Sequence, residues 1–266
     1  MKKYFLFIAV IIVLISCKPS ADKSIASTVL YDSAYVPAVF ADANRVEKIK
    51  AAFTVIDSLY KKYATDNHFP AISFGIVVDG QLLYKNSYGY TDVAKKTPAT
   101  SASLFRIASM SKSFTCMAML KLRDEGKLNL DDPAYLYIPE LKNLKYPTAD
   151  APVITIRHLM THGAGFPEDN PWGDRQLADT DKDLMEFIGK QISFSNPPGI
   201  AYEYSNLGFA LQGKIISKVS GMRYQDYIKK NILDPLGMKT TTYEFGDVTP
   251  DKLAHGYRWL NEQWNE

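Results

Sequence analysis

A serine and a lysine one turn apart, at the start of an apolar helix, constrain the fold of this chain more than any other feature. The stretch runs from Leu104 to Gly126 and contains Ser109 and Lys112. Residues three apart lie on the same face of a helix, so the lysine amine can approach the serine hydroxyl. Four apolar residues predict that this helix is anchored in a core, namely Phe114, Met117, Ala118 and Leu122.

The pair has the chemistry of an activated nucleophile. A serine hydroxyl is a weak nucleophile near neutral pH, and a neighbouring amine that is neutral can accept its proton. The amino end of a helix also presents free backbone N–H groups, which stabilise developing negative charge. The other interpretation is a capped core helix whose lysine is simply solvated.

The pattern Ser-x-x-Lys occurs three times, so its surroundings must decide between the copies. Ser20 and Lys23 lie in a polar stretch next to the N-terminal apolar run. Ser58 and Lys61 lie inside an amphipathic helix whose polar face needs no chemistry. Only Ser109 combines a helix start with an apolar helix behind it, and it is therefore the candidate nucleophile.

The N-terminus has the layout of a secretory signal. Two lysines precede an apolar run over residues 4–15, which is too short for a comfortable membrane span. The run ends in Leu14-Ile-Ser-Cys17, which resembles the bacterial lipobox, and the resemblance implies that Cys17 is lipidated. We therefore expect residues 1–17 to be a lipoprotein-type signal peptide. The mature protein would be lipid-anchored in the cell envelope and face the periplasm or the exterior. The alternative is an ordinary cleaved signal with an incidental cysteine.

Residues 18–41 mix small, charged and proline residues without a sustained period, and they are predicted to form a tether. The folded domain is expected to occupy residues 42–266. Asp42 can cap a helix that runs through Tyr63, and two β-rich runs follow within residues 71–90. Asp79-Gly80 separates these runs and predicts a tight hairpin turn. A helix, a hairpin and a buried helix together indicate an α/β fold.

The charge balance argues against one class of partner. The chain carries 31 basic and 29 acidic residues, well mixed, for a net charge of +2. A nucleic-acid-binding domain normally concentrates basic residues in a patch or stripe, and no basic tract is present in this sequence. We expect no nucleic-acid partner.

Two histidines, His158 and His162, are four residues apart in a short helix that Thr155 can cap. This is a metal-ligand spacing, but the residues between them include no glutamate and no third ligand is evident. Helix packing or hydrogen bonding is the expected role of both histidines, and no metal site is predicted.

A second informative stretch is Tyr204-Ser-Asn206. It follows a turn rich in proline and glycine and directly precedes an apolar helix that begins near Leu207. Polar side chains at such a loop-to-helix junction can face a cleft. The same pattern occurs at Tyr84-Lys-Asn86, on a strand of the predicted hairpin, where a packing role suffices.

Five motifs in order resemble the serine hydrolases related to class C β-lactamases and D-alanyl-D-alanine carboxypeptidases, a family that also includes esterases and D-amino-acid peptidases. The resemblance covers residues 45–258. The motifs are Arg106-Ile-Ala-Ser-Met-Ser-Lys112, Gly126-Lys-Leu-Asn-Leu-Asp-Asp-Pro133, Ile156-Arg-His-Leu-Met-Thr-His-Gly163, Pro198-Gly-Ile-Ala-Tyr-Glu-Tyr-Ser-Asn206 and Asp234-Pro-Leu-Gly-Met238. The implied fold is α/β of the α+β type, the β-lactamase/transpeptidase-like fold, with an antiparallel sheet flanked by helices and a mostly helical lobe.

The resemblance also implies roles for four residues. Ser109 would be the nucleophile that accepts the acyl group, and Lys112 its partner in proton transfer. Tyr204 would deprotonate the serine or activate the hydrolytic water, and Asn206 would hydrogen-bond the substrate amide. A phenol is a poor base near neutral pH until a cation stabilises its phenolate, which a lysine nearby can do.

The predicted function is therefore hydrolysis of an amide, β-lactam or ester carbonyl through an acyl-enzyme, without a metal or organic cofactor. The substrate would be a small molecule or a peptidoglycan peptide, chosen partly by the loop over residues 163–177. One alternative is a non-catalytic envelope lipoprotein that binds peptidoglycan peptides through the same cleft. Another is a lipoprotein scaffold whose motifs serve only the fold.

The family's third motif is the one departure. The resemblance calls for a Lys- or His-x-Gly strand beside the nucleophile, followed by further strands and a last helix, but His255-Gly-Tyr257 has the wrong spacing. We therefore expect the chain to be incomplete at its C-terminus. The sheet would then have an unpaired edge and the oxyanion hole would lack one N–H donor, and such a donor is worth about 3 to 4 kcal/mol.

Overall fold

The computed structural model describes residues 39–169, 180–190 and 192–266. Contacts divide the chain into two units, residues 1–46 and 47–266. The predicted signal peptide with Cys17, and the predicted tether up to residue 38, lie outside the described residues. In the first unit the Asp42 carboxylate accepts a hydrogen bond from the Asn44 backbone N–H at 2.9 Å. Among the described residues, no helix is both long enough and apolar enough to cross a membrane.

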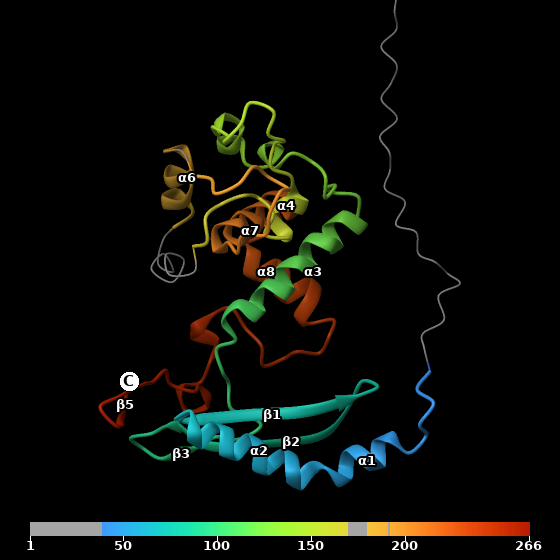
Figure 1. Cartoon of the computed structure of the whole chain (residues 1–266), viewed down its shortest axis with the longest axis vertical. Helices are drawn as coiled ribbons and strands as arrows, with labels where there is room; N and C mark the ends of the chain where they lie inside the picture. Colours follow the sequence, from blue (N-terminus) through green and yellow to red (C-terminus); the bar gives the residue numbers. More distant parts are fainter. Residues whose placement is uncertain (1–38, 170–179, 191) are drawn as a thin grey trace, which may run out of the picture. The chain divides into compact units, whose positions relative to one another are not determined.

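Figure 1 shows the helices and strands of the described residues. The α-helices are α1 (Arg45–Ala51), α2 (Phe53–Asp66), α3 (Ser111–Asp124), α4 (Ile156–Met160), α6 (Asp181–Gly189), α7 (Asn206–Ser220) and α8 (Tyr224–Ile228). Shorter 3₁₀ turns are η1 (Ala108–Met110), η2 (Ala134–Leu136), η3 (Pro139–Asn143), η5 (Phe245–Asp247) and η6 (Pro250–Lys252), and η4 (Lys229–Leu233) is a π-helical turn. The strands are β1 (Ala71–Val78), β2 (Gln81–Asp92), β3 (Thr97–Pro98), β4 (Arg258–Leu260) and β5 (Gln263–Asn265).

The predicted hairpin is confirmed. Strands β1 and β2 pair antiparallel, with Val78 opposite Gln81 beside the turn and Ala71 opposite Gly89 at the far end. Asp79 and Gly80 form the two-residue turn with φ values of 51° and 75°, as a type I′ turn requires. The three-stranded sheet has the order β1-β2-β3, so β1 pairs on one side only among the described strands.

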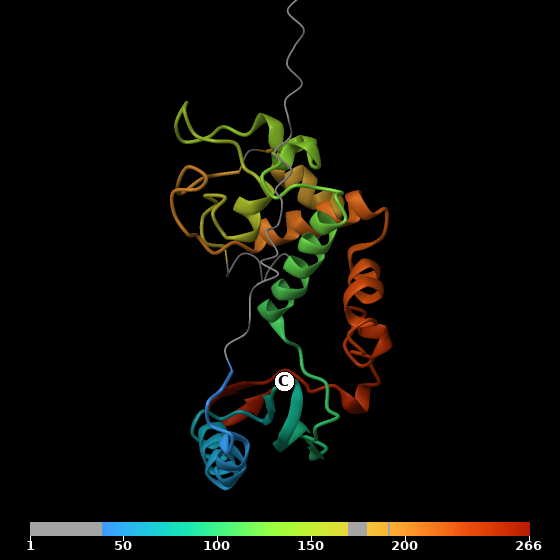
Figure 2. The same ribbon diagram turned by 90° about the vertical axis from the view of Figure 1, so that its right-hand side faces the viewer.

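Helix α2 packs against this sheet through aromatic side chains, and Figures 1 and 2 both show it running alongside the strands. The Tyr60 ring stacks on Phe74 at 4.2 Å, and Phe53 stacks on Tyr84 at 4.3 Å. The single helix predicted from Asp42 to Tyr63 is wrong, because the chain breaks between α1 and α2 at Ala52. The Ala52 N–H bonds the carbonyl three residues back, at Ile49, which tightens the turn.

Two glycines of the hairpin give a matched test of backbone crowding. Both have positive φ, but a Cβ at Gly89 would lie 2.1 Å from the Pro70 carbonyl oxygen, whereas a Cβ at Gly80 would meet nothing within 4 Å. We expect Gly80→Ala to lower the free energy of unfolding by about 1 kcal/mol, the cost of a left-handed L-residue. Gly89→Ala should lower it by about 3 kcal/mol or more, because two strand backbones must also separate. Urea denaturation measures both free energies of unfolding. Equal losses in the two variants would show that backbone crowding at Gly89 does not contribute to stability.

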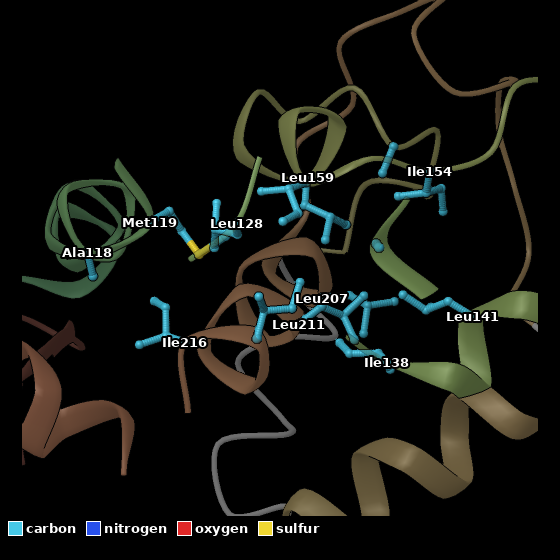
Figure 3. Close-up of a cluster of buried hydrophobic side chains, with 14 of the residues drawn as sticks. Ala118, Met119, Leu128, Ile138, Leu141, Ile154, Leu159, Leu207, Leu211 and Ile216 are labelled. Atoms are coloured by element: carbon cyan, nitrogen blue, oxygen red, sulfur yellow. The ribbon is translucent and has the colours of Figure 1, made fainter. Parts of the chain in front are cut away.

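A second group of elements, α3, α4, α7 and α8, surrounds the main core. Figure 3 shows side chains of this core gathered between the helices, among them Met119, Leu159 and Leu211, each fully buried. The predicted inward positions Ala118 and Leu122 of α3 are buried, but Met117 is 39% exposed and Met119 takes its place in the core. These three buried residues fix the rotation of the nucleophile helix, and the face that carries Lys112 is left free to meet α7.

Gly126 ends α3 as predicted. Its φ is 68°, and the Lys127 N–H bonds the Leu122 carbonyl at 2.9 Å while the Gly126 N–H bonds Arg123 at 2.8 Å. These two bonds form a Schellman motif, which satisfies carbonyls at the helix end.

The strands β4 and β5 form a C-terminal hairpin that the sequence did not predict. Trp264 donates its indole N–H to the His68 carbonyl at 2.9 Å, and the His68 ring stacks on Trp259 at 4.1 Å. The His255-Gly-Tyr257 segment precedes this hairpin, where the His255 backbone N–H bonds the Thr91 carbonyl and the Tyr257 hydroxyl accepts the Val93 N–H.

Candidate active site

Ser109 lies in a tight 3₁₀ turn directly before α3, so the nucleophile helix begins two residues later than a serine-initiated helix would. The residue before it, Ala108, has a φ of 43°, an uncommon left-handed backbone for a residue with a side chain. Leu104, which leads into the turn, exchanges backbone hydrogen bonds with Lys252 at 2.7 Å and Ala254 at 2.8 Å. The turn presents Ser109 as an exposed residue.

Lys112 contacts each of the other three predicted site residues. Its Nζ donates to Ser109 Oγ at 3.0 Å, to Tyr204 Oη at 2.7 Å and to Asn206 Oδ1 at 2.7 Å. An ammonium group has three donors, and these three oxygens take all of them. The ammonium also lies 4.8 Å from the centre of the Tyr204 ring and 5.4 Å from that of Phe209, within cation–π range.

Tyr204 completes the arrangement at the nucleophile. Its Oη is 2.6 Å from Ser109 Oγ, and its second neighbour is the Lys112 ammonium. The Asn206 side-chain oxygen is 3.4 Å from the same hydroxyl. The cation beside Tyr204 Oη stabilises the phenolate form of the side chain, and this form is placed to take the serine proton.

Helix α7 holds the Tyr204-Ser-Asn206 triplet at its amino end, as predicted. Ser205 is the N-cap, and its hydroxyl accepts the Gly208 N–H at 3.1 Å. Leu207, Leu211, Ile215 and Ile216 bury the inward face of the helix. The cap fixes the backbone of Ser205, which lies between Tyr204 and Asn206, and so it fixes the positions of both side chains relative to the helix.

Asp169 also binds the amino end of α7, and the sequence did not reveal it. Its carboxylate accepts the backbone N–H groups of Asn206 at 2.6 Å and Leu207 at 2.7 Å, and the Ser205 hydroxyl at 3.1 Å. A carboxylate at this position satisfies unpaired donors and complements the helix dipole. The only signal in the sequence was an acidic residue in the loop that follows the Thr-His-Gly motif.

The two histidines have different structural partners. His158 Nδ1 accepts the Thr155 N–H at 3.2 Å while the Thr155 hydroxyl caps α4 in return, which confirms the predicted cap. His162 lies beyond the end of α4, which stops at Met160, and its Nδ1 accepts the Ser205 N–H at 3.0 Å. Within the described ranges no group of three or more metal-type side chains is assembled.

A cleft of about 1420 Å³ opens beside Ser109, Lys112 and Asn206. Residues from α3, α6, α7 and α8 line it, including the apolar side chains of Leu184, Phe187 and Phe209. The predicted selectivity loop over residues 163–177 is described only as far as Asp169, and its remainder lies outside the described residues.

Comparison with known proteins gives a consistent result. The model of the family described as Beta-lactamase matches residues 56–265. Protein flp of Staphylococcus aureus (strain MW2) is 34% identical over 208 residues, which are 76% of this chain and 40% of that protein. Beta-lactamase-like protein 2 of Dictyostelium discoideum is 34% identical over 216 residues, 78% of this chain and 39% of its own length. The chain thus spans about 40% of the length of these curated relatives.

Solved structures extend the likeness to the fold. The octameric penicillin-binding protein homologue from Pyrococcus abyssi is 32% identical, with a TM-score of 0.69 over 80% of this chain and 49% of that one. A class C β-lactamase is 26% identical, with a TM-score of 0.68 over 85% of this chain and 59% of that one.

Proposed function

Because the chain belongs to the Beta-lactamase family of serine hydrolases, we propose that it hydrolyses a carbonyl substrate through an acyl-enzyme formed on Ser109. The family and the fold predicted from the five motifs are confirmed. One observation carries the proposed activity: Ser109 Oγ lies 2.6 Å from Tyr204 Oη and 3.0 Å from Lys112 Nζ. A hydroxyl between a proton acceptor and a cation is the arrangement that makes serine a nucleophile.

In the first half of the proposed reaction, Ser109 Oγ attacks the substrate carbonyl carbon, and its proton passes to Tyr204 Oη, which reacts as a phenolate stabilised by Lys112 and becomes a neutral phenol. The carbonyl electron pair moves to the oxygen, close to the positive amino end of α3. The intermediate then collapses, and the bond to the leaving amine or alcohol breaks. That group departs with the proton held by the Tyr204–Lys112 pair, and an ester on Ser109 remains.

In the second half, water attacks the ester carbonyl and gives its proton to the same pair. The bond to Ser109 Oγ breaks, the serine regains a proton, and a carboxylic acid leaves. Asn206 lines the cleft together with Lys112, and its side-chain amide can bind an amide of the substrate there. The substrate classes that we propose are β-lactams, D-amino-acid peptides and esters, because each has a carbonyl carbon that Ser109 can attack.

Covalent labelling tests this proposal. The chain is incubated separately with a fluorescent penicillin, a p-nitrophenyl ester and a peptide ending in D-alanyl-D-alanine, and then digested with trypsin. Cleavage after Arg106 and Lys112 releases the fragment of residues 107–112, which contains Ser109 and Ser111. We expect at least one reagent to add its acyl mass to this fragment, with fragmentation placing the mass on Ser109.

Two outcomes would contradict the proposal. An adduct on Ser111 would show that Ser111, and not Ser109, is the nucleophile. Saturable binding of the reagents without any adduct would favour the non-catalytic binding protein, since a binding cleft needs no covalent step.

A further inference from the structure

The His162 side chain is tied to the backbone of the catalytic triplet. Its Nδ1 accepts the Ser205 N–H at 3.0 Å, and its own carbonyl accepts the Glu203 N–H at 2.9 Å. An imidazole nitrogen accepts a hydrogen bond only when it carries no proton, so the observed contact requires the neutral ring with its proton on Nε2. The contact is therefore sensitive to the ionisation of His162.

The same ring supports the Tyr204 side chain. The two rings stack with their centres 4.7 Å apart and an angle of 27° between their planes. Phe209 at 5.0 Å and Tyr202 at 5.3 Å pack against other parts of the imidazole. His162 also has a φ of 56°, a left-handed backbone that persists only when its surroundings fix it.

Titratable groups of three segments face the imidazole. The Lys112 ammonium of α3 is on the catalytic side, the Asp169 carboxylate comes from the following loop, and the Tyr204 hydroxyl lies on the stacked ring. The Glu203 carboxylate is directed instead to the Asn196 amide at 3.4 Å. Burial lowers the pKa of His162 and the Lys112 charge lowers it further, while Asp169 opposes both.

We propose that neutral His162 is a positioning residue that holds Tyr204 against Ser109 and Lys112, and that protonation of this imidazole switches the site off at low pH. The inference rests on the proposed acyl-enzyme chemistry. It adds His162 as a residue that acts through Tyr204 rather than on the substrate, and it adds low pH as the condition under which Tyr204 leaves Ser109 and Lys112.

The direction of the pH effect follows from the chemistry of the ring. Since the pKa of His162 lies below its ordinary value near 6.5, the ring is neutral at neutral pH and gains a proton only as the pH falls through that lowered pKa. A protonated Nδ1 carries an N–H and can no longer accept a hydrogen bond. It then faces the Ser205 N–H, and the two donors repel each other. The new positive charge also faces the Lys112 ammonium, so the triplet is expected to move away from Ser109.

The acylation rate of Ser109 as a function of pH tests the proposal. We compare the wild-type chain with His162→Asn and with His158→Asn as the matched control. The asparagine side-chain oxygen can replace Nδ1 as the acceptor of the Ser205 N–H, but it does not titrate. His158 makes the same kind of contact, from Nδ1 to the Thr155 N–H, outside the catalytic group.

We expect the wild-type rate to fall about tenfold per pH unit below the pKa of His162. His162→Asn should keep a rate within about tenfold of wild type at pH 7.5 and lose this acid limb, whereas His158→Asn should retain it. His162→Phe, which offers no acceptor, should be slower by about a hundredfold at every pH, because the reacting groups are misplaced. A residue with a purely structural role would change the rate without moving the pH profile.

A second measurement needs no activity. The amide resonance of Ser205 in the wild-type chain, followed by NMR, should shift with the same midpoint as the His162 ring. An unshifted Ser205 amide, or an acid limb unchanged in His162→Asn, overturns this inference alone. A wild-type chain that forms no adduct at any pH overturns the proposed function, and this inference with it.

Discussion

Ser109→Ala is expected to abolish both the acyl adduct and hydrolysis, with a loss of at least about a thousandfold. The variant removes the hydroxyl oxygen that lies 3.0 Å from Lys112 Nζ and 2.6 Å from Tyr204 Oη. The fold should be unaffected, because Ser109 is exposed and its side chain packs into no core. Intact-protein mass spectrometry measures the adduct, and release of p-nitrophenol measures turnover.

The chain supplies its own control for this variant. Ser58 begins a second Ser-x-x-Lys pattern, on the exposed side of α2, where its hydroxyl donates to the Thr54 carbonyl at 2.9 Å. Ser58→Ala should therefore leave adduct formation unchanged. Residual labelling of Ser109→Ala at the wild-type rate would show that another residue is the nucleophile.

Lys112→Met is expected to slow acylation by about a hundredfold to ten thousandfold. Methionine keeps most of the side-chain volume but removes all three donors, to Ser109, Tyr204 and Asn206. The Tyr204 oxygen then loses the cation that stabilises its negative charge, so the serine proton has no favourable destination. Stopped-flow measurement of the acylation rate under saturating reagent gives the effect on the chemical step.

Lys61→Met is the corresponding control, because Lys61 occupies the lysine position of the Ser58 pattern on the exposed face of α2. We expect its acylation rate to equal that of wild type. If Lys112→Met acylated as fast as Lys61→Met, the lysine would have no part in proton transfer, and the pairing with Tyr204 would serve only the fold.

Local features of the fold were predictable from the sequence because their causes lie close together in the chain. Asp79-Gly80 specifies its turn through two positive φ values, and Gly126 specifies the end of α3 in the same way. Ser109 and Lys112 meet because helix geometry brings residues three apart onto one face. None of these inferences depends on a distant segment.

Other features depend on long-range packing and could not be read from a pattern. Leu59 and Tyr63 share the helical period of α2, yet they are 62% and 56% exposed, because the sheet contacts the neighbouring face through Tyr60. Asp169 reaches the amino end of α7 across more than thirty residues of chain. A lone aspartate in a loop gives no indication of such a partner.

The repeated Tyr-x-Asn pattern shows the same limit. Tyr84 and Asn86 both hydrogen-bond Asp57 of α2, and these bonds lower the pKa of that carboxyl group. The copy at Tyr204 and Asn206 instead meets a lysine from α3. Two copies of one pattern thus have different partners, which only the tertiary structure distinguishes.

The left-handed backbone at Ala108 sets a limit on how far this protein can be improved by directed evolution. An L-residue in that conformation costs the folded state about 1 to 2 kcal/mol, and glycine is the replacement that relieves it. Glycine at this position would also increase the backbone flexibility of the turn that carries Ser109. Selection for heat resistance alone therefore acts against the geometry of the nucleophile, and thermal tolerance and catalytic competence compete at this one residue.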